Sequence, residues 1–385
     1  MKTRGTSASW YRGQDLTVEE RQIFSDRSKA AGQAKRLSLD GLASGPRLPV
    51  NIPALDPCAL MPIAPANSLR SLSLFSGGGG LDLAFDRAGY EHAGSFELLE
   101  VAAATLRSNR PSWHIAGGRD GDVRPIDWRK YKGKIEVLHG GPPCQPFSVA
   151  GRQQGESDPR DMWPEFVRAV LTIDPLAFVG ENVSALLSPK FGPYVQNTIL
   201  GPLASRYTVR VLDLSAASYG VPQTRRRAIF VGFRNKRHAK RFSSPPAICQ
   251  ASSEALPAEL PLCLRAREAL GLPPTDHDAL APTMRSGFTG PRHSTSICSS
   301  ASALRAWNRL GIWPNGVART REAAQAFPVA NGHFRLSLAD CALLQGFPPD
   351  WLFQGPVYAA LGQLGNAVAP PMGYAIARAV DRALL

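Results

Sequence analysis

The central part of the chain, residues 70–233, alternates short apolar runs with segments of helical periodicity. The apolar runs predict strands at 70–75, 93–97, 135–139, 176–180, 207–214 and 228–233. Apolar residues at positions 81, 84, 85 and 88 share one helical face, and further helices are expected near 101–110, 161–173 and 194–205. This alternation predicts an α/β fold with a doubly wound, mainly parallel, Rossmann-like sheet. Ligands of such sheets bind at the carboxyl ends of the strands.

The flanking segments have different patterns. Residues 1–68 are polar and then proline-rich, with a helix expected at 16–35, begun by a capping box of Thr17 and Glu20, before an extended linker. Residues 235–333 are irregular, which is typical of a separate loop-rich module. A short helix N-capped by Ser337 and an amphipathic helix over 371–385 follow. We therefore expect four parts: an extension (1–68), a sheet domain (69–234), a smaller module (235–333) and C-terminal helices that return to the sheet (334–385).

Composition narrows the functional classes. Hydrophobic residues make up 44% of the 385 positions and charged residues 19%, as in ordinary globular proteins. The 44 Lys and Arg residues against 31 Asp and Glu residues leave a net charge of +13. Most of these cations are arginines, whose guanidinium groups bind phosphate and guanine, so a polyanionic partner is expected. Codon bias in a GC-rich genome would produce the same composition.

Neither a signal peptide nor a membrane span is expected. The first residues lack an apolar core, and no apolar stretch approaches the length of a transmembrane helix. The 6 cysteines are scattered, without a C-x-x-C pair or a compact Cys/His cluster. These features predict a reduced, cytoplasmic protein that needs no metal.

The turn FSGGGG follows the first predicted strand and opens a helix, where a backbone approaches a nucleotide-like ligand closely. It is not the dinucleotide fingerprint, because Asp82 occupies the position of the third glycine. Glu97 lies 20 residues after Gly77, where a carboxylate accepts hydrogen bonds from ribose hydroxyls. Asp122 could accept one from an adenine amino group. These elements in order predict an adenosyl ligand, and the simpler alternative is a tight turn.

The sequence GGPPCQPFS, residues 140–148, follows the strand that ends at His139. Its prolines stiffen the loop, so Cys144 would be presented rigidly as a nucleophile, the alternative being a buried structural cysteine. Glu181 ends the next strand, and Arg225 and Arg227 share one face of an extended segment. Together these groups could attack, protonate and hold an electron-poor heteroaromatic ring. Separately, such residues are more often salt-bridge or solvated surface groups.

The ordered set of motifs over 70–385 resembles the DNA cytosine-5 methyltransferases. FSGGGG is similar to the first motif of this family, FELLEVAAATLRSNRP to the second, GDV to the third, PPCQPFS to the catalytic fourth, DPRDMW to the fifth, ENV to the sixth and QTRRR to the eighth. RLSLADCALLQGFP and GQLGNAVAP resemble the ninth and tenth. By this resemblance, 69–234 is the catalytic and cofactor-binding domain, and 235–333 is the target recognition domain.

The resemblance implies S-adenosylmethionine as the methyl donor and double-stranded DNA as the substrate. Cys144 would add to C6 of a flipped cytosine while Glu181 holds N3 and the exocyclic amine. Arg227 would contact the cytosine carbonyl, and Arg225 would support the loop and a nearby phosphate. The expected cofactor-binding residues are Phe75, Ser76, Gly77, Gly79, Gly80, Glu97, Leu98, Asp122, Val123, Pro143, Met162, Asn366 and Ala367. The expected substrate-binding residues are Gln145, Ser148, Asn182, Gln223, Arg285 and Arg292.

Three positions depart from the family pattern: Leu99 stands where Asp is frequent, Met162 where Leu is usual and Ala367 where Ser is common. Each lies at the cofactor's periphery, which puts affinity in doubt and leaves the reaction type unchanged. The basic run at 234–241 is expected to neutralise DNA phosphate. The recognition sequence itself does not follow from the residues.

The alternatives are a tRNA-methylating enzyme of the same family and, from another class, a catalytically idle DNA-binding regulator. A tRNA-methylating enzyme usually carries Cys-Phe-Thr after ENV, whereas Ser184, Ala185 and Leu186 follow here. A catalytically idle DNA-binding regulator would have no chemical need for Cys144, Glu181 and Arg227 together. A DNA enzyme is therefore preferred. The resemblance further implies a monomer in the bacterial cytoplasm with the nucleoid DNA, and a restriction endonuclease acting on the same site.

Overall fold

The structure, a computed structural model, describes residues 47–143, 161–250, 260–286, 295–298, 300–326, 329 and 332–385, and positions 22, 33, 36, 37 and 40. The helix expected at 16–35 falls almost entirely outside this part of the chain. Within the described residues, no helix combines the length and the apolar character needed to cross a membrane.

A seven-stranded sheet with the order β3-β2-β1-β4-β5-β7-β6 forms the larger lobe. Its strands are β1 (Arg70–Leu74), β2 (Glu91–Glu97), β3 (Ile115–Gly117), β4 (Val137–Gly140), β5 (Ala177–Val183), β6 (Thr208–Ser215) and β7 (Arg226–Phe233). β1 to β5 are parallel, and β7 is antiparallel to both β5 and β6. The mixed α/β fold and the six predicted strands are confirmed. The three-residue strand β3 is too short to give a periodic signal.

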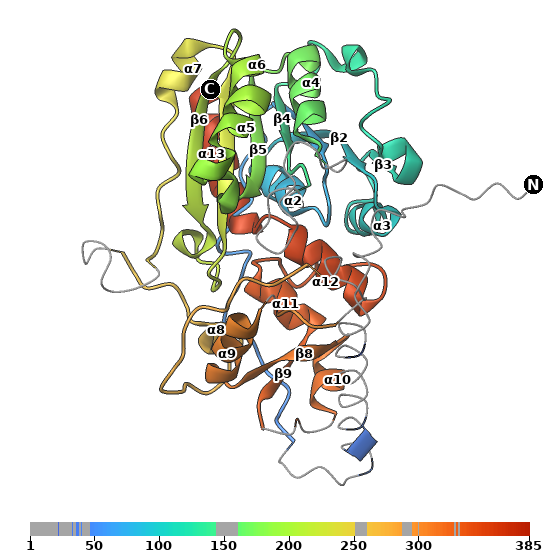
Figure 1. Cartoon of the computed structure of the whole chain (residues 1–385), viewed down its shortest axis with the longest axis vertical. Helices are drawn as coiled ribbons and strands as arrows, with labels where there is room; N and C mark the ends of the chain where they lie inside the picture. The colour runs from blue at the N-terminus through green and yellow to red at the C-terminus, as the bar shows by residue number, and fades with distance from the viewer. Residues whose placement is uncertain are drawn as a thin grey trace, which may run out of the picture.

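Helices cover both faces of this sheet (Figure 1). On one face, α2 (Gly80–Arg87), α7 (Lys236–Arg241) and α13 (Pro370–Leu384) share an apolar core with Val137 of β4. On the other face, α4 (Trp163–Ile173) packs in a core with Leu138 of the same strand. Neighbouring residues of β4 thus point to opposite faces, and both are buried, which explains why the strands are continuous apolar runs.

The remaining helices of this lobe differ in regularity. α3 (Glu100–Asn109) packs beside β2 and β3. The helix expected at 194–205 is present, and it changes in type along its length: α5 (Gly192–Tyr194), the π-helical η7 (Val195–Leu200) and α6 (Gly201–Leu203) follow one another without a break. Pro202 cannot donate the backbone hydrogen bond that a regular helix needs at this point, which accounts for the irregularity.

The smaller lobe is built on two parallel strands, β8 (Ile312–Ala318) and β9 (Phe334–Ser337). Around them lie α8 (Ala266–Ala269), α9 (Ala301–Arg309), α10 (Arg321–Gln325), α11 (Leu338–Leu344) and α12 (Val357–Asn366). Residues of α9, β9, α11 and α12 share one apolar core. The boundary expected between 333 and 334 therefore differs from the packing, because β9 and α11 belong to this lobe. Of the helices after β9, it is α13 that packs on the large sheet (Figure 1).

The proline-rich segment 47–67 lies against both lobes. The Asn51 side chain donates to the Leu270 carbonyl at 2.9 Å and to Asp340 at 3.1 Å in the smaller lobe. Further along, the Asn67 side chain donates to Asp381 of α13 at 3.2 Å. These contacts join the lobes through a segment that the sequence presents only as an extended linker.

Candidate active site

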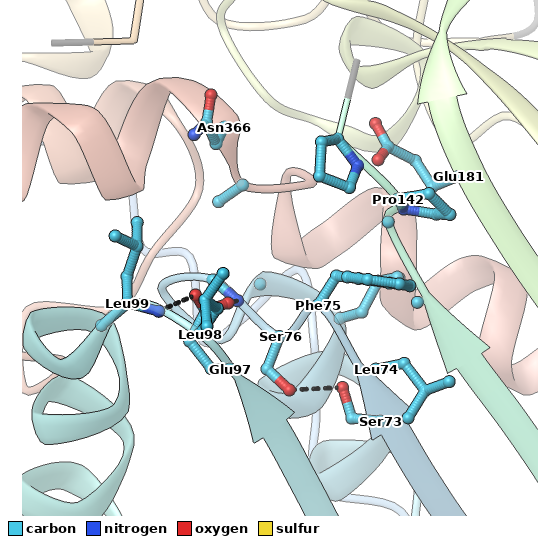
Figure 2. A pocket seen from close by; sticks show the side chains of 18 of the residues that line it. Ser73, Leu74, Phe75, Ser76, Glu97, Leu98, Leu99, Pro142, Glu181 and Asn366 are labelled. Atoms are coloured by element: carbon cyan, nitrogen blue, oxygen red, sulfur yellow. Dashed lines mark hydrogen bonds between the residues drawn. The ribbon is translucent and has the colours of Figure 1, made fainter. Parts of the chain in front are cut away.

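A cavity of about 280 Å³ opens at the carboxyl edge of the large sheet, beside the point between β1 and β4 where the strand order reverses. Ligands of open α/β sheets bind at this place. Of the residues expected to bind the cofactor, all line the cavity except Gly79: Phe75, Ser76, Gly77, Gly80, Glu97, Leu98, Asp122, Val123, Pro143, Met162, Asn366 and Ala367. Glu181 and Arg227 line it too, and Glu97 and Glu181 lie on opposite sides (Figure 2).

Side chains on one side and a backbone segment on the other lie close against the glycine turn after β1. Gly79 has a left-handed φ of 85°, and a Cβ there would collide with Leu106 and Trp351. A Cβ on Gly80 would collide with the Val368 carbonyl of the segment entering α13. The Trp351 indole also donates to the Gly78 carbonyl at 3.0 Å. Gly79 therefore turns the chain behind the cavity wall, whereas Gly80 lies on the wall.

Glu97 ends β2 with both carboxylate oxygens in use. The backbone N–H of Gly77 donates to Oε2 at 2.6 Å and that of Leu99 donates to Oε1 at 2.7 Å. Burial raises the pKa of Glu97 to about 7, although these two donors act to lower it. Glu97 lines the cavity, where the remaining lone pairs of its carboxylate could accept hydrogen bonds from hydroxyl groups.

Asp122 lies on the cavity wall beside a residue that the sequence interpretation did not include. Arg124 donates to both oxygens of Asp122, at 2.9 Å from Nε to Oδ1 and 2.6 Å from Nη2 to Oδ2. These hydrogen bonds lower the pKa of the Asp122 carboxyl group. The only sequence signal for Arg124 was its position two residues after the aspartate.

Glu181 and Arg227 form a buried ion pair that opens into the cavity. Val183 of β5 is paired with Arg227 of β7, which brings Arg227 to Glu181 two residues earlier on the same face. The Arg227 Nε to Glu181 Oε1 distance is 2.8 Å, with side-chain exposures of 10% and 8%. Burial raises the pKa of Glu181, although Arg227 and Arg225 act to lower it. A Cβ on Gly141 would crowd the Glu181 carboxylate, so the glycine directly before the Pro-Pro sequence leaves room for this group.

Asn182, next to Glu181, points away from the cavity. Its amide donates to the Pro142 carbonyl at 3.1 Å and accepts from the Val183 backbone N–H at 2.9 Å. Its side chain is buried and does not line the cavity. The expected substrate contact is therefore replaced by support of the loop that continues into Cys144.

The structure also corrects the expectations for Arg225 and Gln223. Arg225 is fully buried and donates from Nη2 to the carbonyls of Gly365 and Ala367, at 3.0 and 2.5 Å. A group enclosed in this way is not available to a DNA phosphate. Gln223, also fully buried, donates to the Leu344 carbonyl and to the Gln345 side chain. Arg225 thus holds the 365–367 wall of the cavity directly, and Gln223 is linked to it through Gln345, whose amide donates to the Ala367 carbonyl at 2.9 Å.

The other expected DNA-contacting residues are described only in part. Cys144, Gln145, Ser148 and Arg292 lie outside the described residues, and Pro143 is the last described position before them. Arg285 is partly buried, and its backbone N–H donates to the Ile297 carbonyl at 3.0 Å. The adjoining Ser286 donates to the Gly362 carbonyl of α12 at 3.0 Å. Arg285 thus lies where the smaller lobe meets the cavity wall.

Several lining residues were not in the sequence-based set, among them Asp82, Leu99, Gln363 and Val368. Gln363 and Val368 flank Asn366 within the tenth motif, so motif membership was the available signal. Asp82 is fully buried, and the Ser95 hydroxyl donates to it at 2.6 Å. Burial raises the pKa of Asp82 to about 6.

The parallel sheet with β7 inserted antiparallel, and a cavity that joins a carboxylate after β2 to an ion pair from β5 and β7, define an α/β enzyme with a nucleotide-type ligand site. The chain belongs to the C-5 cytosine-specific DNA methylase family, whose pattern matches residues 69–269 and 293–382. It is a DNA cytosine-5 methyltransferase, as the motif resemblance predicts.

Bacterial type II methyltransferases align with most of this chain. The type II methyltransferase M.NgoMIV of Neisseria gonorrhoeae is 34% identical over 321 residues, 82% of this chain and 97% of the relative. M.FnuDI of Fusobacterium nucleatum is 31% identical over 337 residues, 82% of this chain and 95% of the relative.

Solved structures agree on the fold. A putative DNA modification methyltransferase encoded within an Escherichia coli prophage superposes with a TM-score of 0.53 at 21% identity, covering 82% of this chain and 99% of that one. A variant of Spodoptera frugiperda DNMT2 superposes with a TM-score of 0.54 at 15% identity, covering 81% and 99%.

Proposed function

We propose that this enzyme transfers a methyl group from S-adenosylmethionine to C5 of a cytosine flipped out of double-stranded DNA, through a covalent adduct at Cys144. The observation that carries the proposal is the buried Glu181–Arg227 ion pair, which faces the same cavity as Glu97 and adjoins the loop that leads to Cys144. One cavity thus has an end suited to an adenosyl group and an end suited to a pyrimidine.

The residues at the adenosyl end fit this cofactor. Glu97 would accept hydrogen bonds from the ribose hydroxyls. Asp122 would accept a hydrogen bond from the adenine amino group, which would replace one of those it accepts from Arg124. The partly exposed Phe75 side chain lies on the cavity wall beside them. When bound, S-adenosylmethionine supplies an electrophilic methyl group on its sulfonium centre.

The residues at the pyrimidine end supply the activation. The Cys144 thiolate would add to C6 of the cytosine, which places negative charge on the ring. Glu181 would hold N3 and the exocyclic amine, and burial, which raises the pKa of its carboxyl group, favours its taking up a proton that can be shared with N3. Arg227 would donate to the cytosine carbonyl. After C5 has been methylated, loss of the C5 proton expels the cysteine.

The biological setting follows from the type II relatives. We propose that the enzyme is the modification component of a restriction-modification system, a monomer in the bacterial cytoplasm that protects a short DNA site from a partner endonuclease. Arg285 and Arg292 would contact bases of that site, and Gln145 and Ser148 would contact the DNA around the flipped cytosine.

Bisulfite sequencing of DNA from cells that express the chain tests the proposal directly. A single methylated sequence context is expected with the wild-type chain and none with Cys144→Ala. Unmethylated DNA from cells with abundant wild-type protein would reject the proposal. Separately, DNA with 5-fluorocytosine at the site should trap the enzyme covalently, and a trapped peptide with a cysteine other than Cys144 would reject the assigned nucleophile.

A further inference from the structure

Two buried cysteines with no part in this mechanism lie next to each other where the chain passes from the large sheet to the smaller lobe. The backbone N–H of Gln250 donates to the Pro261 carbonyl at 2.9 Å, and that of Cys263 donates to the Gln250 carbonyl at 2.9 Å. This pairing brings Cys249 and Cys263 into one small buried cluster with Ala217. Both side chains are buried, since the residues are only 6% and 3% exposed.

Both thiols also contact the segment that leads to the cavity. The Cys249 thiol lies 2.9 Å from the Ala217 carbonyl and the Cys263 thiol 3.5 Å from the Val221 carbonyl, each positioned to donate to it. Ala217 and Val221 lie just before Arg225, which holds the 365–367 wall, and Arg227, which pairs with Glu181. A change in the oxidation state of the two sulfur atoms would therefore alter the contacts of the segment that enters β7.

The two cysteines differ in acidity in the way that disulfide formation needs. The neighbouring Cys263 thiol lowers the pKa of Cys249. The same interaction and burial raise the pKa of Cys263. By contrast, burial raises the pKa of Cys298 to about 11 and that of Cys341 well above its usual value. A thiolate beside a protonated thiol is the arrangement that reacts with oxidants and then closes.

We propose that Cys249 and Cys263 are a redox modification site that forms a reversible disulfide with a peroxide as oxidant. The Cys249 thiolate attacks one peroxide oxygen, the O–O bond breaks, and with one proton the products are a sulfenic acid and water. The Cys263 sulfur then attacks the Cys249 sulfur, the S–O bond breaks, and the hydroxide leaves with the Cys263 proton as a second water. Overall, two thiols are oxidised to one disulfide and one peroxide is reduced to two waters.

The disulfide has a structural consequence for the active site. Neither sulfur retains a proton, so the carbonyls of Ala217 and Val221 lose their thiol donors. The sulfur atoms must also approach to bonding distance, which displaces the segment before Arg225. Methyl transfer should slow in the oxidised enzyme. This last step rests on the proposed role of Arg227, whereas the disulfide chemistry does not.

The chemistry is tested on the full chain carrying Cys144→Ser, so that the proposed nucleophile does not compete. The protein is treated with hydrogen peroxide, unfolded, alkylated with N-ethylmaleimide and digested with trypsin. Both cysteines fall in the peptide 242–265, since Arg241 and Arg265 are adjacent cleavage sites. We expect this peptide to be two hydrogen atoms lighter, to take no maleimide until reduced with dithiothreitol, and to stay joined after cleavage at Glu254 and Glu259.

Cys341, which is buried, and Cys298 serve as internal controls that should alkylate fully in the same sample. The proposal is overturned if Cys249 and Cys263 alkylate as fully as Cys341. It is also overturned if Cys249 is found as a sulfinic acid or joined to another cysteine.

The consequence is tested by methylation rates with Cys144 intact. Peroxide should slow the wild-type enzyme about tenfold, as expected for a slightly misplaced active-site group, and dithiothreitol should restore the rate. The double variant Cys249→Ser, Cys263→Ser keeps hydroxyl donors for both carbonyls and should lose only the activity that oxidation of Cys144 itself removes, which is less than the wild-type enzyme loses. An equal loss in both proteins assigns the sensitivity to another cysteine and rejects the coupling. An untreated wild-type enzyme without activity would instead refute the proposed function.

Discussion

Two buried carboxylates face one cavity with different partners, and their chemistry differs accordingly. Glu97 accepts two backbone N–H groups, whereas Glu181 is paired with the Arg227 guanidinium. Burial raises the pKa of both groups. Burial alone therefore does not distinguish the two groups, and their different hydrogen-bonding partners do.

Replacing Glu181 with Gln should slow methyl transfer about 100-fold, because the amide cannot supply a proton to N3. Binding of S-adenosylmethionine should stay within experimental error, since Glu97 and Asp122 are unchanged. Single-turnover methylation and calorimetric titration of the cofactor measure the two effects. Glu136→Gln is a matched control, because Glu136 pairs with Arg70 at the start of the strands, and its rate should be normal. A weaker cofactor affinity with a normal rate would contradict the assignment.

Glu97 should make stability depend on pH. Its pKa is about 7 in the folded chain and about 4.5 when unfolded, so between these values the folded state keeps a proton that the unfolded state loses. Stability from this group is therefore present below pH 4.5 and is lost as the pH rises to 7, by up to about 3 kcal/mol. The stability of wild type relative to Glu97→Gln, from urea unfolding of cofactor-free protein, should fall over this range. A difference that is constant with pH would show that Glu97 titrates normally.

Short segments at the carboxyl edge of the sheet give the cavity its shape. The turn after β1 approaches the backbone of Val368 closely, and Gly141 at the end of β4 makes room for Glu181. Glycine is required at these positions because a Cβ atom would collide with the residues packed against them, whatever the backbone angles.

Gly80→Ala should destabilise the enzyme by about 1–3 kcal/mol, because the added methyl group meets the Val368 carbonyl in a closely packed region. Cofactor affinity should also fall, since Gly80 and Val368 both line the cavity. Thermal unfolding and cofactor titration test this. Gly192→Ala is the control, because a Cβ there meets no atom within 4 Å, and its stability should be unchanged or slightly higher. Equal behaviour of the two variants would show that the turn tolerates a side chain.

The two lobes are joined through buried polar contacts as well as through the chain. Arg225 and Gln223, which enter β7, hold the segments around Gly365 and Leu344. On another side, Asn51 and Asn67 connect the segment 47–67 to each lobe in turn. The cavity therefore depends on contacts between residues far apart in the sequence.

Arg225→Ala should cost about 2–5 kcal/mol of stability, because it leaves a void and removes the donor to two buried carbonyls. Its neighbour Arg226 forms an ion pair with Asp213 at an exposed position, so Arg226→Ala should cost less than about 1 kcal/mol. Urea unfolding of the two variants makes the comparison. Similar small losses would mean that the Arg225 contacts contribute little.

The basic helix α7 should not contribute to DNA binding, in contrast to the expectation from sequence. β7 runs antiparallel, so it ends at Phe233 beside Ala177, the first residue of β5, at the edge opposite the cavity. Lys240→Ala should therefore leave the salt dependence of DNA binding unchanged, whereas loss of a phosphate contact would reduce the log-log slope by about one unit. Arg285→Ala, beside the cavity wall, should instead cost about 1–3 kcal/mol on the cognate site. A reduced slope for Lys240→Ala would place DNA on the far edge too.

Local pattern was sufficient for much of the fold and for several site residues. Apolar or alternating runs mark six of the seven strands of the large sheet, including the antiparallel β6 and β7, so these six could be predicted. Because parallel strands end at one edge, Glu97 and Glu181 could be expected in one cavity. Alternation along an extended segment also put Arg225 and Arg227 on one face.

Non-local packing settled what these patterns leave open. Arg225 and Arg227 look equivalent in the sequence, yet the first meets the carbonyls of 365–367 and the second meets Glu181. The pairing of β8 with β9, the hydrogen bonds of Arg124 to Asp122 and the contact of Cys249 with Cys263 likewise depend on chain segments brought together by folding. Periodicity records which face of an element is buried, and it carries no information about which distant segment buries it.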